Sequence, residues 1–256
     1  MAEPKVILVT GGGSGMGQLA CTNYARDGWK VAAFDINDAG LEKTSAPWGN
    51  VTTWNVDITD FAALEEAVAE VEALLGPIHT VYNCAAILPM GRLLEQDNGI
   101  IHKQMQINYG GLVNISQTAL TRMVARGDGV FVSFASMAAH VPTLLTGAYC
   151  ATKAAVATYN EVLYHENRDS GVKFASVCPP LVNTPLLDQG RETVWPKMLD
   201  AAGEAIKPQV VLDKIEDCIA KGRFNVFPTK VCTLMYYVRR LFPAAVWSYI
   251  HRVEGF

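Results

Sequence analysis

The sequence has no long basic run, no close cysteine pair and no obvious metal-ligand cluster. Its formal net charge is −4, which makes nucleic acid an unexpected partner. The six cysteines are scattered, with no CxxC pair and no His/Cys group, which argues against disulfides and a metal site. No signal peptide precedes the strand expected to start near Lys5. We therefore expect free thiols in a reducing compartment and a cytoplasmic location.

Long apolar runs are also lacking, since none reaches the roughly 20 residues of a transmembrane helix. The most unusual segment is the apolar and aromatic C-terminal tail, about residues 229–256, which Arg239 and Arg240 interrupt. Basic residues among aromatic ones could lie on a membrane surface. Packing of the tail against a neighbouring subunit, or over a pocket, is the favoured interpretation.

Short apolar runs alternate with helical patterns along the chain. A helix is expected over Phe61–Leu75, and a longer one from about Gln104 to Arg126. Strands are expected at 6–10, 30–35, 51–56, 78–83, 129–135, 172–178 and 223–227. Repeated βαβ units predict an α/β fold, a Rossmann-like, doubly wound parallel sheet of about seven strands. We expect a single domain over residues 1–256, with substrate-loop helices at about 181–220.

A glycine-rich turn follows the first expected strand. The apolar run Val6–Thr10 leads directly into residues 11–17, Gly-Gly-Gly-Ser-Gly-Met-Gly, and then into a helical pattern. This order is typical of a dinucleotide site, where bare backbone approaches the pyrophosphate at a helix N-terminus. Asp35 ends the second strand, where a carboxylate accepts hydrogen bonds from ribose hydroxyls and disfavours a 2′-phosphate. The sequence therefore predicts NAD as the cofactor.

Tyr149 and Lys153 are four residues apart, so a helix would present both side chains on one face. A lysine in that position stabilises a phenolate and makes the phenol usable as an acid or base near neutral pH. The spacing alone is weak support, because a surface tyrosine over a lysine stem gives the same pattern.

Several motifs occur together in a fixed order. They are Thr10–Gly17, which resembles a TGxxxGxG turn; Asp57-Ile58; Asn83–Ala86; the set Asn108, Ser136, Tyr149 and Lys153; and Pro179–Thr184. On these motifs the chain resembles the compact short-chain dehydrogenase/reductase family over nearly its whole length. Ala86, Ala139 and Pro180 stand where that family usually has glycine, which adds bulk near the site.

The resemblance implies an NAD-dependent alcohol dehydrogenase or ketoreductase. Tyr149 would be the acid/base, Lys153 would lower its pKa and bind the nicotinamide ribose, and Ser136 would hold the substrate oxygen. Asn108 would support a water relay from Lys153. The implied cofactor-binding residues are Gly11, Ser14, Gly15, Met16, Gly17, Asp35, Ile36, Asp57, Ile58, Asn83, Ala85, Tyr149, Lys153, Pro179, Val182 and Thr184.

The family builds its substrate pocket from the segments after the fourth, fifth and sixth strands. Here these are mostly apolar, which predicts a bulky hydrophobic secondary alcohol or ketone. The candidate pocket residues are Leu88, Met137, His140, Leu144, Leu145, Leu181, Leu186 and Trp195. His140 is the one polar candidate for a substrate contact in the second of these segments, although an exposed loop position is the favoured interpretation.

Three further expectations stay open at this stage. By resemblance, the protein would form a homodimer or homotetramer. A catalytically silent NAD-sensing or scaffold protein would share the fold, although the Ser-Tyr-Lys group is intact here. An epimerase or dehydratase of related chemistry is the third reading, although such enzymes usually have a different glycine spacing and a larger C-terminal domain.

Overall fold

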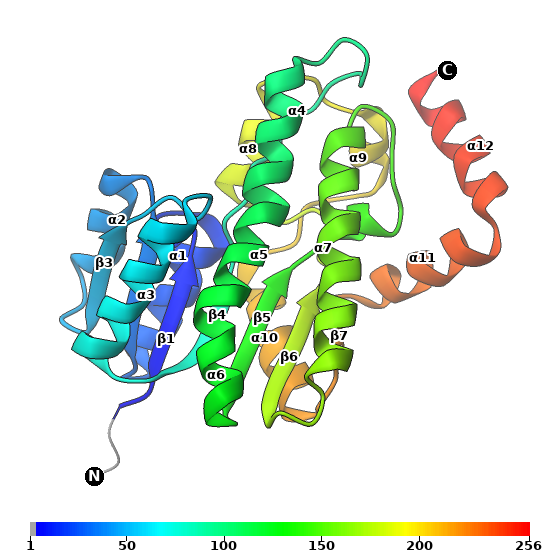
Figure 1. Ribbon diagram of the computed structural model, residues 1–256. Coiled ribbons are helices and arrows are strands. Elements are labelled where there is room, and N and C mark those ends of the chain that lie inside the picture. Colours follow the sequence, from blue (N-terminus) through cyan, green and yellow to red (C-terminus); the bar gives the residue numbers. More distant parts are fainter. Residues whose placement is uncertain (1–3) are drawn as a thin grey trace.

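The computed structural model describes residues 4–256, which form one seven-stranded parallel sheet with helices on both faces (Figure 1). The strand order is β3-β2-β1-β4-β5-β6-β7. The predicted doubly wound parallel sheet is thereby confirmed. The strands are β1 (Val6–Thr10), β2 (Lys30–Asp35), β3 (Val51–Asn55), β4 (Ile78–Asn83), β5 (Gly129–Phe134), β6 (Val172–Val177) and β7 (Asn225–Val226).

The helices begin and end close to the turn residues of the sequence. They are α1 (Gly15–Arg26), α2 (Asp38–Ser45), α3 (Phe61–Leu75), α4 (Asn98–Met105), α5 (Gly111–Ile115), α6 (Thr121–Arg126), α7 (Gly147–Glu166), α8 (Pro185–Arg191), α9 (Lys197–Ala201), α10 (Pro208–Ala220), α11 (Lys230–Leu241) and α12 (Pro243–Glu254). Two π-helical turns, η1 (Gln106–Gly110) and η2 (Ser116–Leu120), join α4, α5 and α6 into one continuous helical segment, and η3 (Met137–Ala139) is a 3₁₀ turn.

Strand β1 shows why the sheet needs helices on both faces. Val6 and Leu8 pack into one core cluster with residues of α3, α5 and α7, whereas Ile7 and Val9 pack into a second with α1 and α10. All four side chains are almost fully buried. A strand covered on both sides is apolar at every position, which is the pattern that identified it in the sequence.

The order of the strands fixes where a ligand can bind. From the central pair β1 and β4, the chain runs outward through β2 and β3 on one side and through β5 to β7 on the other. In sheets of this kind, ligands bind at the carboxyl ends of the strands where the direction reverses. Here a hydrogen bond joins the carboxyl ends of β1 and β4: the Thr10 hydroxyl donates to Oδ1 of Asn83 over 2.7 Å.

The structure corrects one helix boundary and adds two helices. The helix expected from Gln104 begins at Asn98, because the Asp97 side chain accepts a hydrogen bond from the amide of Ile100 and caps it. The C-terminal tail, for which no secondary structure was predicted, forms α11, which Thr229 caps, and α12, which begins at Pro243. Within residues 4–256, no helix combines the length and the apolar character needed to cross a membrane.

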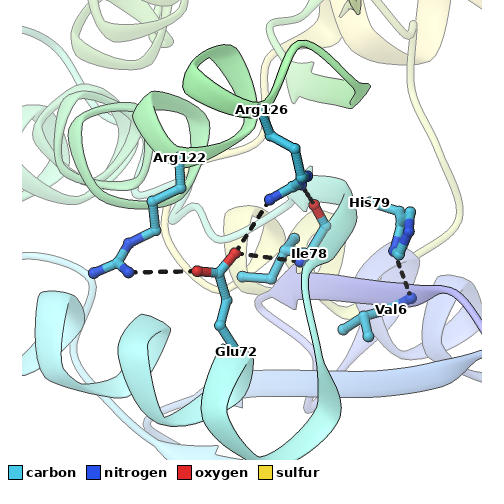
Figure 2. A network of polar contacts seen from close by, with 6 residues as sticks. All are labelled: Val6, Glu72, Ile78, His79, Arg122 and Arg126. Carbon is cyan, nitrogen blue, oxygen red and sulfur yellow. Dashed lines mark hydrogen bonds and ion pairs between the residues drawn. The ribbon is translucent and has the colours of Figure 1, made fainter.

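A polar network joins two helices at the opposite end of the sheet, where the strands begin (Figure 2). Glu72 of α3 pairs with Arg122 at 3.4 Å and with Arg126 at 3.5 Å, both from α6. Arg126 also donates to the carbonyl of Ile78 at the start of β4. One carboxylate thus links two helices to the edge of the sheet that lies away from the predicted site.

We predict that Glu72→Gln will lower the free energy of unfolding by about 1 kcal/mol, because it removes the charge from a partly buried two-arginine network. Urea unfolding at low and high salt would measure the effect, which salt should reduce. Glu66→Gln, at an exposed position of the same helix, is the matched control. Equal stability of the two variants would contradict the role given to Glu72.

Candidate active site

In the turn between β1 and α1, glycines allow backbone atoms to pack directly against other backbone atoms. A β-carbon on Gly17 would lie 2.1 Å from the carbonyl oxygen of Gly11, and one on Gly11 would lie 2.9 Å from the amide nitrogen of Ala85. Gly11 and Gly15 also have positive φ angles of 67° and 54°. Since α1 begins at Gly15, its first amides and the positive end of its dipole lie at this edge of the sheet.

A cavity of about 290 Å³ lies against this turn. It brings together parts of the chain that follow β1, β2, β3, β4 and β6. Most of the predicted cofactor residues line it: Gly11, Ser14, Gly15, Met16, Gly17, Asp35, Ile36, Asp57, Ile58, Ala85 and Thr184.

The remaining predicted cofactor residues lie outside the lining of that cavity. Asn83 accepts the hydrogen bond from Thr10 and holds β4 beside β1. The carbonyl of Pro179 accepts from the amide of Met137 over 2.9 Å, and Val182 pairs with Ile206 in an isolated bridge. These contacts brace the segment after β6. The other two, Tyr149 and Lys153, are on α7.

Asp35, the last residue of β2, lines this cavity, which we call the cofactor groove because most predicted cofactor residues line it. Its Oδ2 accepts from the amide of Gly13 over 2.9 Å, and its Oδ1 accepts from the amide of Asn37 over 3.0 Å. A β-carbon on Gly13 would lie 3.0 Å from Oδ2, so the missing side chain lets the carboxylate reach the turn. Both carboxylate oxygens keep further lone pairs for ligand hydroxyls.

Helix α7 and the end of β5 bring Tyr149, Lys153 and Ser136 together. Lys153 is 4% exposed, and its Nζ donates to the carbonyl of Phe134 over 2.7 Å. The same nitrogen lies 5.7 Å from the centroid of the Tyr149 ring, one helical turn earlier. Ser136 caps η3, and its Oγ accepts from the amide of Ala138 over 3.1 Å. The helical spacing therefore gives the predicted shared face.

The surroundings shift both titrating groups of α7. Desolvation raises the pKa of the Tyr149 phenol well above its ordinary value, and the neighbouring Ser136 side chain acts in the opposite direction. Burial lowers the pKa of the Lys153 ammonium to about 8. Both shifts disfavour charge at the site. The expected lowering of the Tyr149 pKa by Lys153 is not seen: burial sets the direction, and Lys153 is not among the groups that shift the phenol.

Asn108 lies in the π-helical turn η1 and is 2% exposed. Its Oδ1 accepts from the amide of Ile87 over 2.9 Å, while its Nδ2 donates to the carbonyl of Ile87 and to Oγ1 of Thr152, each over 3.0 Å. Thr152 immediately precedes Lys153. The side-chain amide of Asn108 thus joins the loop after β4 to α7, next to Lys153.

Comparison with known proteins places this geometry in a family. A family model described as short chain dehydrogenase matches residues 5–195. The chain belongs to the short-chain dehydrogenase family. It is 26% identical to the rat protein 17-beta-hydroxysteroid dehydrogenase 13, over 98% of this chain and 83% of that protein.

Two further comparisons extend this result. The chain is 32% identical to the probable oxidoreductase EphD of Mycobacterium tuberculosis (strain H37Rv), over 71% of this chain but only 32% of the relative, so it spans about a third of that protein's length. The crystal structure of a short-chain dehydrogenase/reductase from Burkholderia phymatum in complex with NAD superposes with a TM-score of 0.84. It is 23% identical and covers 93% of this chain and 94% of its own, which shows the shared fold.

This family consists of oxidoreductases whose fold binds a nicotinamide cofactor. This chain has a turn that fits such a cofactor, because a β-carbon at Gly11 or Gly17 would fill the space beside the backbone. Amides at the start of α1 suit the pyrophosphate, and Asp35 is at the end of the groove where β2 stops.

The predicted substrate residues are not all brought together: some line one of two cavities and the others lie outside both. Leu186 lines the cofactor groove. Leu145 and Trp195 line a second cavity of about 600 Å³, together with Arg92, Glu254 and other residues. Leu88 is 8% exposed and Met137 packs against one of the two cores. Leu144 and Leu181 are partly buried outside both linings.

The end of the chain forms part of the second cavity. Glu254, the last residue of α12, is 8% exposed and accepts from the amides of Lys197 and Met198 over 3.2 and 2.7 Å. These amides start α9, so the carboxylate caps that helix. The guanidinium of Arg92 lies 4.6 Å from the centroid of the Phe256 ring. The end of the tail, Glu254 and Phe256, therefore forms one wall of the second cavity.

His140 is neither in the cofactor groove nor on an exposed loop. Its ring is half-buried, with Nε2 at 3.4 Å from Sγ of Cys178 and with edge-on contacts to Tyr236 at 4.9 Å and Phe227 at 6.1 Å between centroids. Burial, with the charge of Arg240, lowers its pKa. The favoured interpretation of an exposed loop position is wrong, because α11 folds back over this loop.

Sequence reasoning missed several lining residues of the groove. Lys103 of α4 and Ile107 of η1 line it from one side. Phe34 of β2 and Val56, which follows β3, line it from the sheet. Lys103 and Ile107 are four residues apart, a spacing that would have placed them on one helical face. The signal was lost because the helix was expected to start at Gln104.

We predict that Lys153→Met will abolish dehydrogenase activity and yet raise the free energy of unfolding at pH 7 by roughly 2 kcal/mol, because it removes a buried charge. The folded-state pKa of about 8 lies below the ordinary 10.5, so the unfolded chain binds more protons between these values. Wild-type stability should therefore rise with pH across this window.

Urea unfolding of wild type and Lys153→Met at pH 7 and at about pH 9.5 would measure both effects. The advantage of the variant should shrink at the higher pH. A variant less stable than wild type at both values would contradict the assigned cost of the buried ammonium.

Proposed function

We propose that this protein is an NAD-dependent oxidoreductase that interconverts a bulky, hydrophobic secondary alcohol and its ketone. The observation that carries the proposal is the position of Tyr149. Tyr149 is half-buried, one helical turn before the buried Lys153 and next to Ser136, at the end of the sheet that also holds the glycine turn. An acid/base group, an oxygen-holding hydroxyl and a dinucleotide cradle there support hydride chemistry on a carbinol carbon.

A bound nicotinamide supplies or accepts the hydride. Tyr149 takes the hydroxyl proton of the alcohol during oxidation and returns it to the ketone oxygen during reduction. Ser136 holds that oxygen by a hydrogen bond. Lys153 donates one hydrogen bond to the carbonyl of Phe134, so its ammonium has two donors left for the ribose and for water.

The role proposed for Asn108 rests on its hydrogen bonds. Its side-chain amide is engaged by Ile87 and by Thr152, which precedes Lys153. Asn108 is therefore a positioning residue that fixes α7 against the loop after β4. Support of a water relay from Lys153 remains a prediction, for which the π-helical turn offers backbone carbonyls displaced from regular helical bonding.

The preference for NAD is proposed from Asp35. Its carboxylate is fixed by the amides of Gly13 and Asn37, and further acceptor positions suit the two ribose hydroxyls. The same negative charge disfavours a 2′-phosphate. Ile36 follows Asp35 where an NADP site would have a basic residue, and its side chain is 65% exposed.

The substrate class is proposed from the apolar segments around the site. Leu186 lines the first cavity, and Leu145 and Trp195 line the second beside charged residues such as Arg92 and Glu254. These side chains offer apolar surface for a large hydrocarbon skeleton. The rat relative that matches nearly the full length of this chain is by name a hydroxysteroid dehydrogenase, which is compatible with this class.

We predict that Tyr149→Phe will lower kcat by about 10³-fold, because the phenol oxygen that moves the proton is lost. NADH absorbance would be followed with NAD and a panel of bulky secondary alcohols. Because the raised pKa keeps the Tyr149 phenol protonated at pH 7, oxidation by wild type should speed up as pH rises towards 8, and the gain should level off above that value as Lys153 loses its charge.

Tyr159→Phe is the matched control, because this tyrosine is on the same helix and its hydroxyl lies 3.1 Å from that of Ser116. It should keep wild-type kcat. Equal losses in both variants would contradict the role of Tyr149. Silence of the wild type across the panel, with NAD binding intact, would instead favour a catalytically silent NAD-sensing protein.

We predict that Asp35→Ser will raise KM for NAD by at least about tenfold and narrow the preference for NAD over NADP, because ribose acceptors and a repelling charge are both lost. Initial rates with each cofactor would measure this change. Asp38→Ser, an exposed acid three residues later, should leave the preference unchanged. A wild-type preference for NADP would overturn the reading of Asp35.

A further inference from the structure

Helix α11 presents an apolar face to solvent. Val231, Leu234, Val238 and Leu241 recur at helical spacing, and Tyr237 and Phe242 flank them. Five of these six side chains are between 57 and 68% exposed: Val231, Leu234, Tyr237, Leu241 and Phe242. Figure 1 shows α11 and α12 extending away from the sheet beyond β7. This face, which we call the outer face of α11, is unusually apolar for an exposed surface.

The opposite side of α11 holds the helix in place. Cys232 is buried, and the Tyr236 ring packs edge-on against His140 and close to Phe227. Arg239 lies over the ring of Trp247 from α12, at 6.0 Å from its centroid. The inner side of α11 thus packs against other parts of the protein. These contacts hold the helix with its outer face towards solvent.

The charge of this segment is opposite to that of the protein. From Cys218 to Val253 the sequence has no Asp or Glu, while Lys230, Arg239, Arg240 and Arg252 occur in α11 and α12. The chain as a whole has a net charge of −4, so the remaining residues carry the whole negative balance. Apolar and aromatic side chains with flanking basic residues are characteristic of helices that lie in the interface of anionic membranes.

A second copy of the chain fits this face less well. A two-fold contact pairs the same patch on both subunits, so it would bring Lys230, Arg239 and Arg240 towards their own copies. A contact between the basic tail and an acidic face elsewhere on a copy would be head-to-tail and would build rings or open chains. An anionic lipid surface has the complementary charge and imposes no symmetry.

We propose that the outer face of α11 docks this protein on an anionic lipid surface. Val231, Leu234, Leu241 and Phe242 enter the boundary between headgroups and acyl chains, while Lys230 and Arg240 remain among the headgroups. The helix lies in the plane of the surface. The proposal does not depend on the catalytic role of Tyr149 or on the choice of cofactor.

The test is co-sedimentation of the full chain with large vesicles of phosphatidylcholine alone or with about 30 mol% phosphatidylglycerol. We expect at least about fivefold more bound protein on the anionic vesicles, and a loss of most of this binding in about 0.5 M NaCl. The double variant Leu234→Ser/Leu241→Ser should abolish binding. Leu74→Ser, at a leucine of α3 that is 65% exposed, is the matched control and should bind as wild type.

Circular dichroism and size-exclusion chromatography with light scattering would accompany each variant. If the double variant does not fold, Lys230→Gln/Arg240→Gln provides the second test and should reduce anionic binding severalfold. Failure of wild type to bind either vesicle, or full binding by a folded double variant, would overturn the proposal. Loss of an oligomer in the double variant, with no vesicle binding by wild type, would assign the face to a second copy.

Discussion

The β-carbon that Gly17 lacks would stand 2.1 Å from the carbonyl oxygen of Gly11, and this close approach sets the geometry around it. It lets α1 cross the end of β1 at backbone distance, so that Ala20 and Cys21 pack on the sheet. Gly13, in the same turn, leaves room for the Asp35 carboxylate at the end of β2. The positions of the groove, of the first turn of α1 and of the Asp35 carboxylate therefore all depend on this glycine turn.

The features that sequence predicts well here are those coded locally. A strand buried on both faces must be apolar throughout, and a four-residue spacing on a helix must place Tyr149 and Lys153 together. Other features depend on partners distant in sequence. His140 was ambiguous because Tyr236, almost a hundred residues later, covers it. The start of α4 was missed because one aspartate cap, Asp97, outweighed a weak apolar pattern.

Charged side chains are stabilised differently at the two ends of the sheet. At the amino-terminal edge, Glu72 and its two arginines form a network in which opposite charges meet. At the carboxyl edge, Lys153 is buried with a backbone carbonyl as its hydrogen-bond partner and a lowered pKa. The first arrangement favours folding, whereas the second keeps a costly charge where proton transfer is proposed. A scaffold with a large two-sided core can tolerate such a cost at one edge.

The capping of α9 by Glu254 has a practical consequence for work with this protein. The carboxylate that orders a helix of the substrate loops lies two residues from Phe256, whose ring rests under Arg92 at the second cavity. Any polypeptide joined after Phe256, such as a fusion partner or purification handle, would emerge at the mouth of that cavity. A peptide joined before β1 would instead start from the amino-terminal ends of the strands, away from this cavity.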